Sequence, residues 1–411
     1  MKVYKFGGAS VKDANGVRNV FSILKEDKNN DKVIVISAMG KITNMLEDVV
    51  NDYVNGKSPS LDDVKNYHFS IIKELFPENH SIYDEVNNLF VEIEWAIEDA
   101  PTSTYDYEYD QIVSVGELLS TKIVSAFLSL QGYENSWIDA RDIIRTDNTF
   151  RNARLDWELT TELIHKFISP KGIYITQGFI GCTSENFTTT LGREGSDFTA
   201  AILSFVLESD EVVIWKDVDG MLNADPRYFD DAQLLHQLSF SEAIELAYFG
   251  AKVIHPKTIQ PLKEKNIPLR VKSFIKPENE GTIIFEDAEM RPFLPSYIIK
   301  ENQILISISA KDLSFIVEDH LSHIFALFSK YGLRINVMQS TAVSFSACTD
   351  NDIQKVPALI KELESGYLVK YIDGLTLCTI RHYSDNDISR VFRGKSLLLE
   401  QKSNETAQFV Y

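Results

Sequence analysis

Short apolar segments alternate with helical patterns through the first 285 residues, and this alternation limits the fold more than any other feature. Strands that are buried on both faces form continuous apolar runs, and a helix between successive strands makes those strands parallel. We therefore predict an α/β domain over residues 1–285, with a mostly parallel sheet between two layers of helices. The expected strands are Val3–Phe6, Val33–Ser37, Ile173–Thr176, Val212–Trp215 and Leu269–Val271, and the expected helices include Gly16–Leu24, Gly116–Leu130 and Ser241–Phe249.

Changes of pattern divide the chain further. Residues 58–110 are polar and rich in helical patterns, and we expect them to form a helical lobe over one edge of the sheet. Turn-forming and charged residues at Pro277–Gly281 and Phe285–Pro295 mark a domain boundary. Residues 298–380 then follow a β-α-β-β-α-β order, which is typical of a small ferredoxin-like α+β unit and ends in the strand pair Tyr367–Tyr371 and Leu375–Ile380. Residues 381–411 resemble the start of a second such unit that is cut short, with a weak helix and one terminal strand.

Composition and charge restrict the partners of the chain. A formal net charge of −19 leaves no basic stripe for nucleic acid or an anionic membrane, although a few local Lys and Arg residues can still bind a phosphate-bearing small molecule. Three widely spaced cysteines, without a CxxC pair, favour reduced thiols. The N-terminus lacks the apolar core of a signal peptide, and we expect no apolar run of membrane-spanning length. The sequence therefore predicts a cytoplasmic protein.

The segment Leu191–Ile202, Leu-Gly-Arg-Glu-Gly-Ser-Asp-Phe-Thr-Ala-Ala-Ile, is the strongest candidate for a binding loop. Its two glycines permit close approach of the backbone, and Ser196 and Asp197 are good N-cap residues for the helix that follows. The N–H groups of the first helical turn and the guanidinium of Arg193 together suit a carboxylate or a phosphate. Taken alone, the segment is equally consistent with an ordinary strand-to-helix turn.

Further candidate residues follow other predicted strands, and parallel sheets bind ligands at these strand ends. Lys5 precedes Gly7 and Gly8, which places an ammonium group and backbone N–H donors where a phosphate can rest. Thr43 contributes a hydroxyl group after the second strand. Glu117 lies in the first turn of a helix, where its carboxylate can meet a cationic amine or simply complement the helix dipole.

The segment from Trp215 to Arg227 and the helix end at Lys252 supply the last candidates. Asp217 and Asp219 can accept a ribose hydroxyl or bind Mg²⁺ indirectly, and Arg227 and Lys252 can contact phosphate. Two Asp residues in a turn are also common where no ligand binds. We expect no residue of this sequence to bind a metal ion directly.

Known phosphate-binding loops do not account for these candidates. Gly56-Lys57-Ser58 and Gly394-Lys395-Ser396 lack the glycine that a P-loop requires five residues earlier, where Asn51 and Ser389 stand. The sequence also lacks the glycine loop, catalytic loop and Asp-Phe-Gly signatures of protein kinases. A chain with this sequence that transfers phosphate must therefore use another scaffold.

In their order along the chain, the motifs resemble those of the aspartate kinases of the amino acid kinase superfamily. Lys5–Ser10 resembles the family's Lys-Phe-Gly-Gly-(Thr/Ser)-Ser strand end, with Ala9 as a departure. Gly192–Asp197 resembles its Gly-Arg-Gly-Gly-Ser-Asp loop, with Glu194 in place of a glycine. The downstream unit is similar to the ACT regulatory domain of the family. The other matching segments are Thr43-Asn44, Gly116-Glu117, Asp217–Arg227, Gly250–Pro256, Ile267–Val271 and Gly281-Thr282.

The resemblance implies transfer of the γ-phosphoryl group of ATP, with Mg²⁺, to the β-carboxylate of L-aspartate, the first step toward lysine, threonine and methionine. It assigns Lys5 and Lys252 to neutralising the transferred charge and Asp197 to orienting both lysines. It assigns substrate binding to Thr43, Glu117, Arg193 and Ser196, and ATP binding to Lys5, Gly7, Gly8, Ser10, Lys216, Asp217, Arg227 and Lys252.

The resemblance also implies regulation and assembly through the ACT region. We expect a homodimer formed through this region and a feedback amino acid, either lysine or threonine. The principal alternative is a non-catalytic or differently specific member of the superfamily that senses an amino acid through its ACT region.

Overall fold

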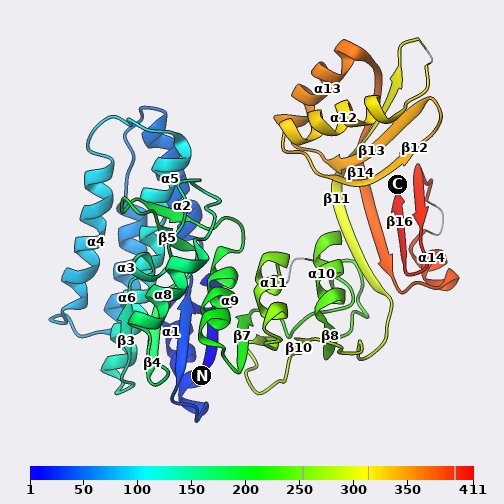
Figure 1. The fold of residues 1–411 in the computed structure, drawn as a ribbon. Coiled ribbons are helices and arrows are strands. Elements are labelled where there is room, and N and C mark those ends of the chain that lie inside the picture. The colour runs from blue at the N-terminus through cyan, green and yellow to red at the C-terminus, as the bar shows by residue number, and fades with distance from the viewer. Residues whose placement is uncertain (252–253, 313, 393–394) are drawn as a thin grey trace. The chain divides into compact units, whose positions relative to one another are not determined.

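A computed structural model describes residues 1–251, 254–312, 314–392 and 395–411 of the chain. These residues form two compact units, each with its own main sheet (Figure 1). The first unit comprises Met1–Met221, Leu234–Ile244 and the segment that ends at Pro292. The second unit comprises Leu222–Gln233, the segment that begins at Glu245, and Phe293–Tyr411.

An eight-stranded sheet in the order β3-β4-β2-β1-β7-β9-β10-β8 forms the centre of the first unit. All neighbouring pairs are parallel except β9 and β10, so the predicted mostly parallel sheet is confirmed. The central strands are almost wholly buried, as their continuous apolar sequence requires. The strands are β1 (Lys2–Phe6), β2 (Lys32–Ile36), β3 (Ser136–Ile138), β4 (Ile173–Gln177), β7 (Glu211–Lys216), β8 (Gln237–Ser239), β9 (Leu269–Ser273) and β10 (Thr282–Phe285).

Helices cover both faces of this sheet. α1 (Ala14–Glu26) leads from β1 to β2, whereas α9 (Gly195–Leu207) leads to β7 on the other side of β1, and right-handed connections therefore place them on opposite faces. α6 (Val115–Leu130) packs with α1, while α8 (Trp157–Phe167) and α11 (Pro256–Glu264) pack with α9. Further elements of this part of the chain are η1 (Gly8–Val11), α2 (Ile42–Val54), α7 (Ala140–Ile143), β5 (Ile180–Cys182), β6 (Thr188–Thr190) and α10 (Phe240–Phe249).

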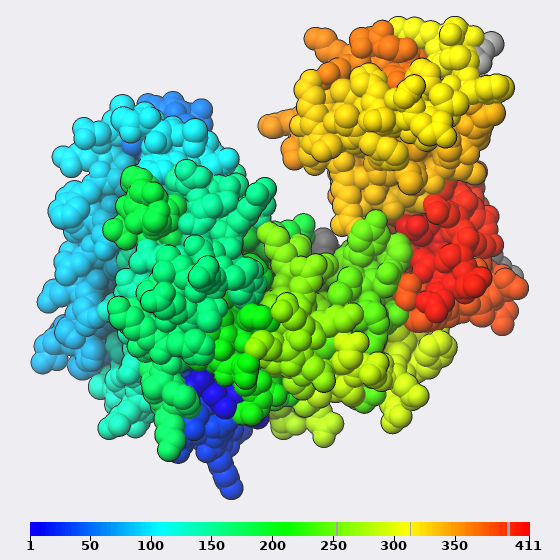
Figure 2. Space-filling view, viewed as in Figure 1, coloured from blue at the N-terminus to red at the C-terminus, as the bar shows by residue number. Residues whose placement is uncertain are grey.

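The polar segment 58–110 is helical and contains α3 (Asp62–Leu75), α4 (Ile82–Ala96) and most of α5 (Tyr105–Val113). It forms part of the surface of the first unit, in light blue in Figure 2. Residues Tyr105–Leu130, which hold α5 and α6, are long and apolar enough to cross a membrane, contrary to the prediction that no apolar run has that length. The most apolar 18-residue window of this stretch is 83% buried within the structure, so its composition is that of a core helix.

The second unit contains a six-stranded antiparallel sheet in the order β12-β13-β11-β14-β16-β15. The element order β11-α12-β12-β13-α13-β14 and the strand order β12-β13-β11-β14 are those of the expected ferredoxin-like unit. α12 and α13 cover one face of the sheet and bury a core that includes Ile306, Phe328 and Leu359 (Figure 1). The bounds are β11 (Ser296–Ala310), α12 (Glu318–Lys330), β12 (Ile335–Ser340), β13 (Ser344–Asp350), α13 (Lys355–Gly366) and β14 (Tyr367–Arg381).

Two details of the second unit differ from the sequence-based expectations. The predicted strands Tyr367–Tyr371 and Leu375–Ile380 are one long strand, β14, which pairs with β11 through register irregularities near Gln303. The segment 381–411 holds α14 (Asp385–Phe392), β15 (Leu399–Lys402) and β16 (Thr406–Val410), of which β15 was not predicted. Because β16 pairs with β14, these residues extend the same sheet.

Candidate active site

A cavity of about 490 Å³ in the first unit lies at the carboxyl ends of β1, β2, β4 and β7, where a parallel sheet binds its ligands. The cavity brings together seven of the predicted site residues, which are Lys5, Thr43, Glu117, Arg193, Ser196, Asp197 and Lys216. The other described residues that line it are Ser37, Tyr109, Arg151, Phe179, Thr190, Gly192, Glu194 and Gly195.

The carboxylate of Asp197 lies between two lysines at one side of the cavity. Nζ of Lys5 is 2.8 Å from Oδ1 of Asp197, and Nζ of Lys216 is 3.3 Å from Oδ2. Lys5 lies in β1 and Lys216 at the end of the neighbouring β7, while Asp197 belongs to the first turn of α9. Burial opposes ionisation, but the two lysines outweigh it and hold the pKa of Asp197 below its usual value. Two cations are therefore fixed where they can stabilise a bound anion.

Glu117 is the second buried carboxylate of the cavity. Glu117 is 3% exposed, and its Oε2 atom has no hydrogen-bond partner among the described residues. Burial raises the pKa of Glu117 to about 8, although the charge of Lys5 and the backbone N–H of Ala38 act in the opposite direction. A buried carboxylate with one unpartnered oxygen suits a cationic group of a ligand, because such a group would satisfy that oxygen and restore the ionised form.

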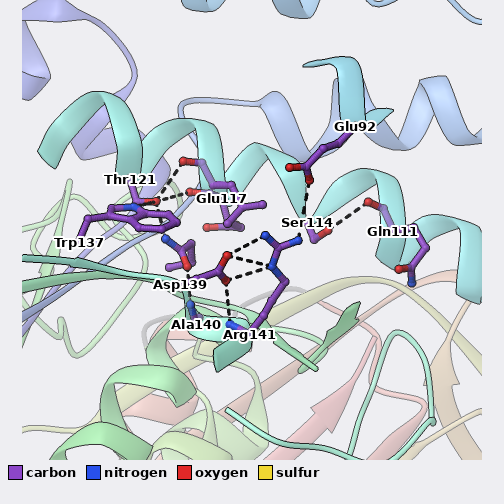
Figure 3. A network of polar contacts seen from close by, with 11 residues as sticks. Glu92, Gln111, Ser114, Glu117, Thr121, Trp137, Asp139, Ala140 and Arg141 are labelled. Atoms are coloured by element: carbon purple, nitrogen blue, oxygen red, sulfur yellow. Dashed lines mark hydrogen bonds and ion pairs between the residues drawn. The ribbon is translucent and has the colours of Figure 1, made fainter. Parts of the chain in front are cut away.

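A network of polar contacts fixes the helix that carries Glu117 (Figure 3). Thr121, one turn further along α6, donates to the backbone oxygen of Glu117 at 3.0 Å. Its hydroxyl accepts hydrogen bonds from Nε1 of Trp137 in β3 at 3.0 Å and from Nε2 of Gln177 in β4 at 2.7 Å. The side chain of Gln177 in turn accepts from the backbone N–H of Ala140 at 2.6 Å. Two strands of the sheet thus hold α6 in place and position Glu117.

The glycine loop leads into α9 differently from the prediction. The N-cap is Glu194, which has a left-handed φ of 54°, and Ser196 and Asp197 lie within the first turn of the helix. The expectation that Ser196 and Asp197 cap the helix is therefore wrong, and the Asp197 side chain binds the two lysines instead. Gly195 is required here, because a Cβ atom would lie 2.7 Å from Cδ2 of Phe179.

Arg193, Thr43 and Ser196 supply further polar groups. Arg193 is exposed and, within the described part of the chain, makes no ion pair or hydrogen bond through its side chain, so its guanidinium can receive a carboxylate. Thr43 and Ser196 lie in the first turns of α2 and α9, and helix N-termini favour bound anions.

Gly7, Gly8 and Ser10 form the turn that follows β1. A Cβ atom on Gly8 would lie 2.6 Å from the backbone oxygen of Ala38, so the backbone passes close to the loop after β2. The hydroxyl of Ser10 is buried and has no hydrogen-bond partner among the described residues. None of the three residues belongs to the described lining of the cavity.

The remaining predicted residues are not brought to this cavity. Asp217 is exposed in the turn after β7 and is absent from the described lining. Asp219 pairs with Lys276 at 3.2 Å. Arg227 belongs to the second unit, where its guanidinium pairs with Asp225. Lys252 lies outside the described residues, so its role stays a prediction.

Sequence reasoning missed Tyr109, Arg151, Phe179 and Thr190, which also line the cavity. Phe179 follows β4 of the parallel sheet, so the strand-end rule that identified Lys5 could have found it. Thr190 ends β6, which pairs only with β5 in a two-stranded antiparallel sheet, and the rule does not apply there. Tyr109 lies in α5, and Arg151 lies in the irregular segment between α7 and α8. Neither position carries a sequence signal for a ligand.

This combination of fold and site defines a kinase of small molecules, and the chain belongs to the amino acid kinase family, whose profile matches residues 1–273. Within that family, the chain groups with the aspartokinases. Lysine-sensitive aspartokinase 3 of Escherichia coli (strain K12) is 32% identical over 399 residues, which cover 94% of this chain and 88% of that protein. Aspartokinase 1 of Arabidopsis thaliana is 33% identical over 404 residues, which cover 92% of this chain and 70% of that protein. The chain spans only 42% of the bifunctional aspartokinase/homoserine dehydrogenase 2 of the same plant.

Solved structures agree with this assignment. E. coli aspartokinase III in complex with aspartate and ADP is similar over 100% of this chain and 96% of its own, with a TM-score of 0.85 and 29% identity. The same enzyme in complex with lysine and aspartate has a TM-score of 0.82. The aspartate kinase of Clostridium acetobutylicum is similar with a TM-score of 0.79 at 25% identity.

Proposed function

We propose that the chain transfers the γ-phosphoryl group of ATP to the β-carboxylate of L-aspartate and yields 4-phospho-L-aspartate and ADP. One observation carries the proposal: a single cavity holds Asp197 between Lys5 and Lys216, beside a buried carboxylate and an unpaired arginine. The aspartate and ADP bound by the similar E. coli enzyme support the same substrates. The reaction begins the routes to lysine, threonine and methionine.

The reaction requires positioning and charge neutralisation rather than a base. A β-carboxylate is already ionised at neutral pH, so no residue has to remove a proton from it. Lys5 neutralises the charge that develops on the transferred group, and the ion pair with Asp197 holds the Lys5 side chain in place. We assign the same neutralising role to Lys252 from the resemblance alone.

The two ends of the amino acid substrate would bind different groups. The ammonium of aspartate meets Glu117 and lowers its pKa, so the buried carboxylate ionises as the substrate enters. Arg193 binds a carboxylate of the substrate, with Thr43 and Ser196 beside it.

Nucleotide binding is assigned to the backbone of Gly7 and Gly8, to Ser10, and to Lys216 and Asp217 at the end of β7. The assignment of Arg227 to ATP stays a prediction from the resemblance. Mg²⁺ is expected to arrive on the phosphates of ATP, whose charge it neutralises.

An ADP-release assay with L-aspartate, L-glutamate and N-acetyl-L-glutamate tests the proposal. Turnover should be fastest with L-aspartate, and the absence of turnover with L-aspartate would overturn the assignment. Addition of lysine or threonine to the same assay tests the feedback that we propose for the ACT-like second unit, which the lysine complex of the similar E. coli enzyme supports.

We also propose a cytoplasmic homodimer that assembles through the second unit. The long strand β14 exposes apolar side chains there, with Leu368, Tyr371 and Ile372 each more than half exposed. Such side chains on one strand favour burial against another molecule. Light scattering of the purified chain should give twice the monomer mass, and a monomer at micromolar concentration would contradict this assembly.

A further inference from the structure

Arg151 enters the cavity from a loop whose backbone is held in an unusual conformation. Its φ is 63°, in the left-handed region that favours glycine. The N–H of Arg151 donates to Oδ2 of Asp110 at 2.9 Å. The fully buried Asp110 also accepts from the backbone N–H and the hydroxyl of Thr190, at 2.8 Å and 2.7 Å. A buried carboxylate therefore fixes the loop of Arg151 to the strand that leads into the glycine loop.

The same two loops touch again one residue further on. A Cβ atom on Gly192 would lie 2.8 Å from Oδ1 of Asn152 and 3.2 Å from the backbone oxygen of Arg151. The N–H of Ala153 also donates to the backbone oxygen of Thr190 at 2.9 Å. The positions of Arg151 and of Arg193, which follows Gly192, are thus coupled through the backbone.

The guanidinium of Arg151 is oriented but retains free donors. It lies over the ring of Tyr109, with Cζ 4.1 Å from the ring centre, and Nη2 contacts Oε1 of Glu47 at 3.0 Å. A weaker ion pair joins Nη1 to Asp106 at 3.8 Å. Its side chain remains 38% exposed and lines the cavity. A guanidinium carries five N–H donors, so these contacts leave several for a ligand.

The cavity thus has two unlike ends. Its lysine end consists of Lys5, Asp197 and Lys216, which belong to β1, α9 and β7, respectively. Its arginine end consists of the loops of Arg151 and Arg193. Glu47, which pairs with Arg151, lies in α2, the helix that follows β2. Strands β2 and β7 lie on opposite sides of β1 in the sheet. Because both groups line one cavity, a substrate whose reacting carboxylate lies at the lysine end can extend its other end toward Arg151.

We propose that Arg151 is a specificity-determining residue that donates to the carboxylate at the non-reacting end of the amino acid substrate, together with Arg193. This inference rests on the proposed function, because that function sets which end reacts. Glu47 is the counter-ion of the guanidinium before the substrate binds, and the substrate carboxylate competes with it. Two guanidinium groups at this end select a substrate with a second carboxylate over one that carries an amide there.

Arg151→Gly is the appropriate test, because glycine accepts the left-handed backbone and keeps the N–H that bonds to Asp110. We expect KM for L-aspartate to rise about tenfold, because one charge-assisted hydrogen bond to the substrate is lost. KM for ATP and kcat should change less than about threefold. The melting temperature should stay level or rise. A purely structural role predicts the opposite pattern, a lower melting temperature with an unchanged KM for aspartate, and that result would overturn the proposal.

The α-amide of L-aspartate separates a contact with the carboxylate from a change of cavity shape. It keeps the reacting carboxylate and lacks the charge at the other end. Arg151→Gly should leave its KM, or its inhibition constant when it acts only as a competitor, within about twofold of the wild-type value. An equal loss for L-aspartate and for its α-amide would overturn the assignment.

Two further variants complete the experiment. Glu47→Gln frees Arg151 and removes a negative charge, so KM for aspartate should stay level or fall. A roughly tenfold rise would show that the ion pair has a structural role and would overturn the proposal. Arg154→Met removes the same charge from an exposed side chain nearby that does not line the cavity, and should behave as wild type. If the wild-type chain fails to phosphorylate aspartate, the proposed function itself fails, whereas an active wild type with an unaltered Arg151→Gly refutes only the role of Arg151.

Discussion

The lysine end and the arginine end of the cavity are built by different means. Residues on neighbouring parallel strands and a helix start form the lysine end, and its charges pair with one another at short distance in a buried setting. Loops form the arginine end, where Arg151 and Glu194 both have left-handed backbones and Arg193 is exposed. Under the proposed function, regular structure fixes the groups assigned to the transferred charge, while loops carry the groups assigned to the rest of the substrate.

This difference has a consequence for substitution. A change at the lysine end leaves a buried charge without its partner, so we expect it to reduce the rate of the chemical step. A change at the arginine end alters exposed or half-exposed groups, so it should act on substrate affinity. Each prediction below tests this separation.

The largest effect is expected for Lys5→Ala. Loss of the ammonium group next to Asp197 should lower kcat about 10²–10³-fold, because a fixed cation no longer stabilises the transferred charge. Steady-state kinetics measures it. Lys2→Ala is the matched control, since Lys2 lies in the same strand but pairs with Glu211 at 3.6 Å outside the cavity. A kcat within twofold of wild type for Lys5→Ala would remove the distinction between the two ends.

Glu117→Gln should raise KM for aspartate by about tenfold or more, because the amide cannot pair with the ammonium group of the substrate. Kinetics at fixed ATP concentration checks this effect. An unchanged KM would show that the amine binds elsewhere.

The same variant has a predicted effect on stability in the absence of substrate. The folded-state pKa of Glu117, about 8, lies above the ordinary value of 4.5, so the folded protein binds this proton more tightly than the unfolded chain does. The stabilisation is complete below pH 4.5 and is lost as the pH rises from 4.5 to 8. The difference between the melting temperature of Glu117→Gln and that of wild type should therefore shift in favour of the variant as the pH approaches 8. An equal difference at pH 5 and pH 8 would contradict this titration.

The smallest effect is expected for Glu194→Gly at the arginine end. Glycine relieves the left-handed backbone at φ 54° and removes a buried carboxylate oxygen that has no hydrogen-bond partner among the described residues. We expect a gain of about 1 kcal/mol in the free energy of unfolding, measured with urea, and little change in kcat. A loss of stability would show that the Glu194 side chain supports the loop.

The separation between the two ends also explains which residues could be predicted. Lys5, Thr43 and Lys216 follow or end strands, and the ends of parallel strands converge whatever the loops do. The position of Arg151 depends on a buried bond to Asp110, which is 41 residues away in the sequence. No local pattern encodes such a contact, so the sequence could not predict that this arginine reaches the cavity.

The second unit shows the same limit at the level of the fold. Asp373 and Gly374 separate two apolar runs and favour a tight turn, which predicts two strands. The structure instead continues one strand through this point, with a φ of 67° at Gly374 and a shifted register against β11. Pairing with a long neighbouring strand therefore overrides the local turn preference.

The position of β16 between β14 and β15 has a consequence for synthesis of the chain. β14 is complete at Arg381, whereas the strand that covers its edge begins at Thr406. While the polypeptide is still being made, β14 presents unpaired backbone groups and an apolar face that includes Cys378 and Ile380, which are buried in the finished unit. The nascent chain is thus open to pairing with a neighbouring strand until the β15–β16 hairpin docks, and the yield of folded protein should depend on how soon that hairpin forms.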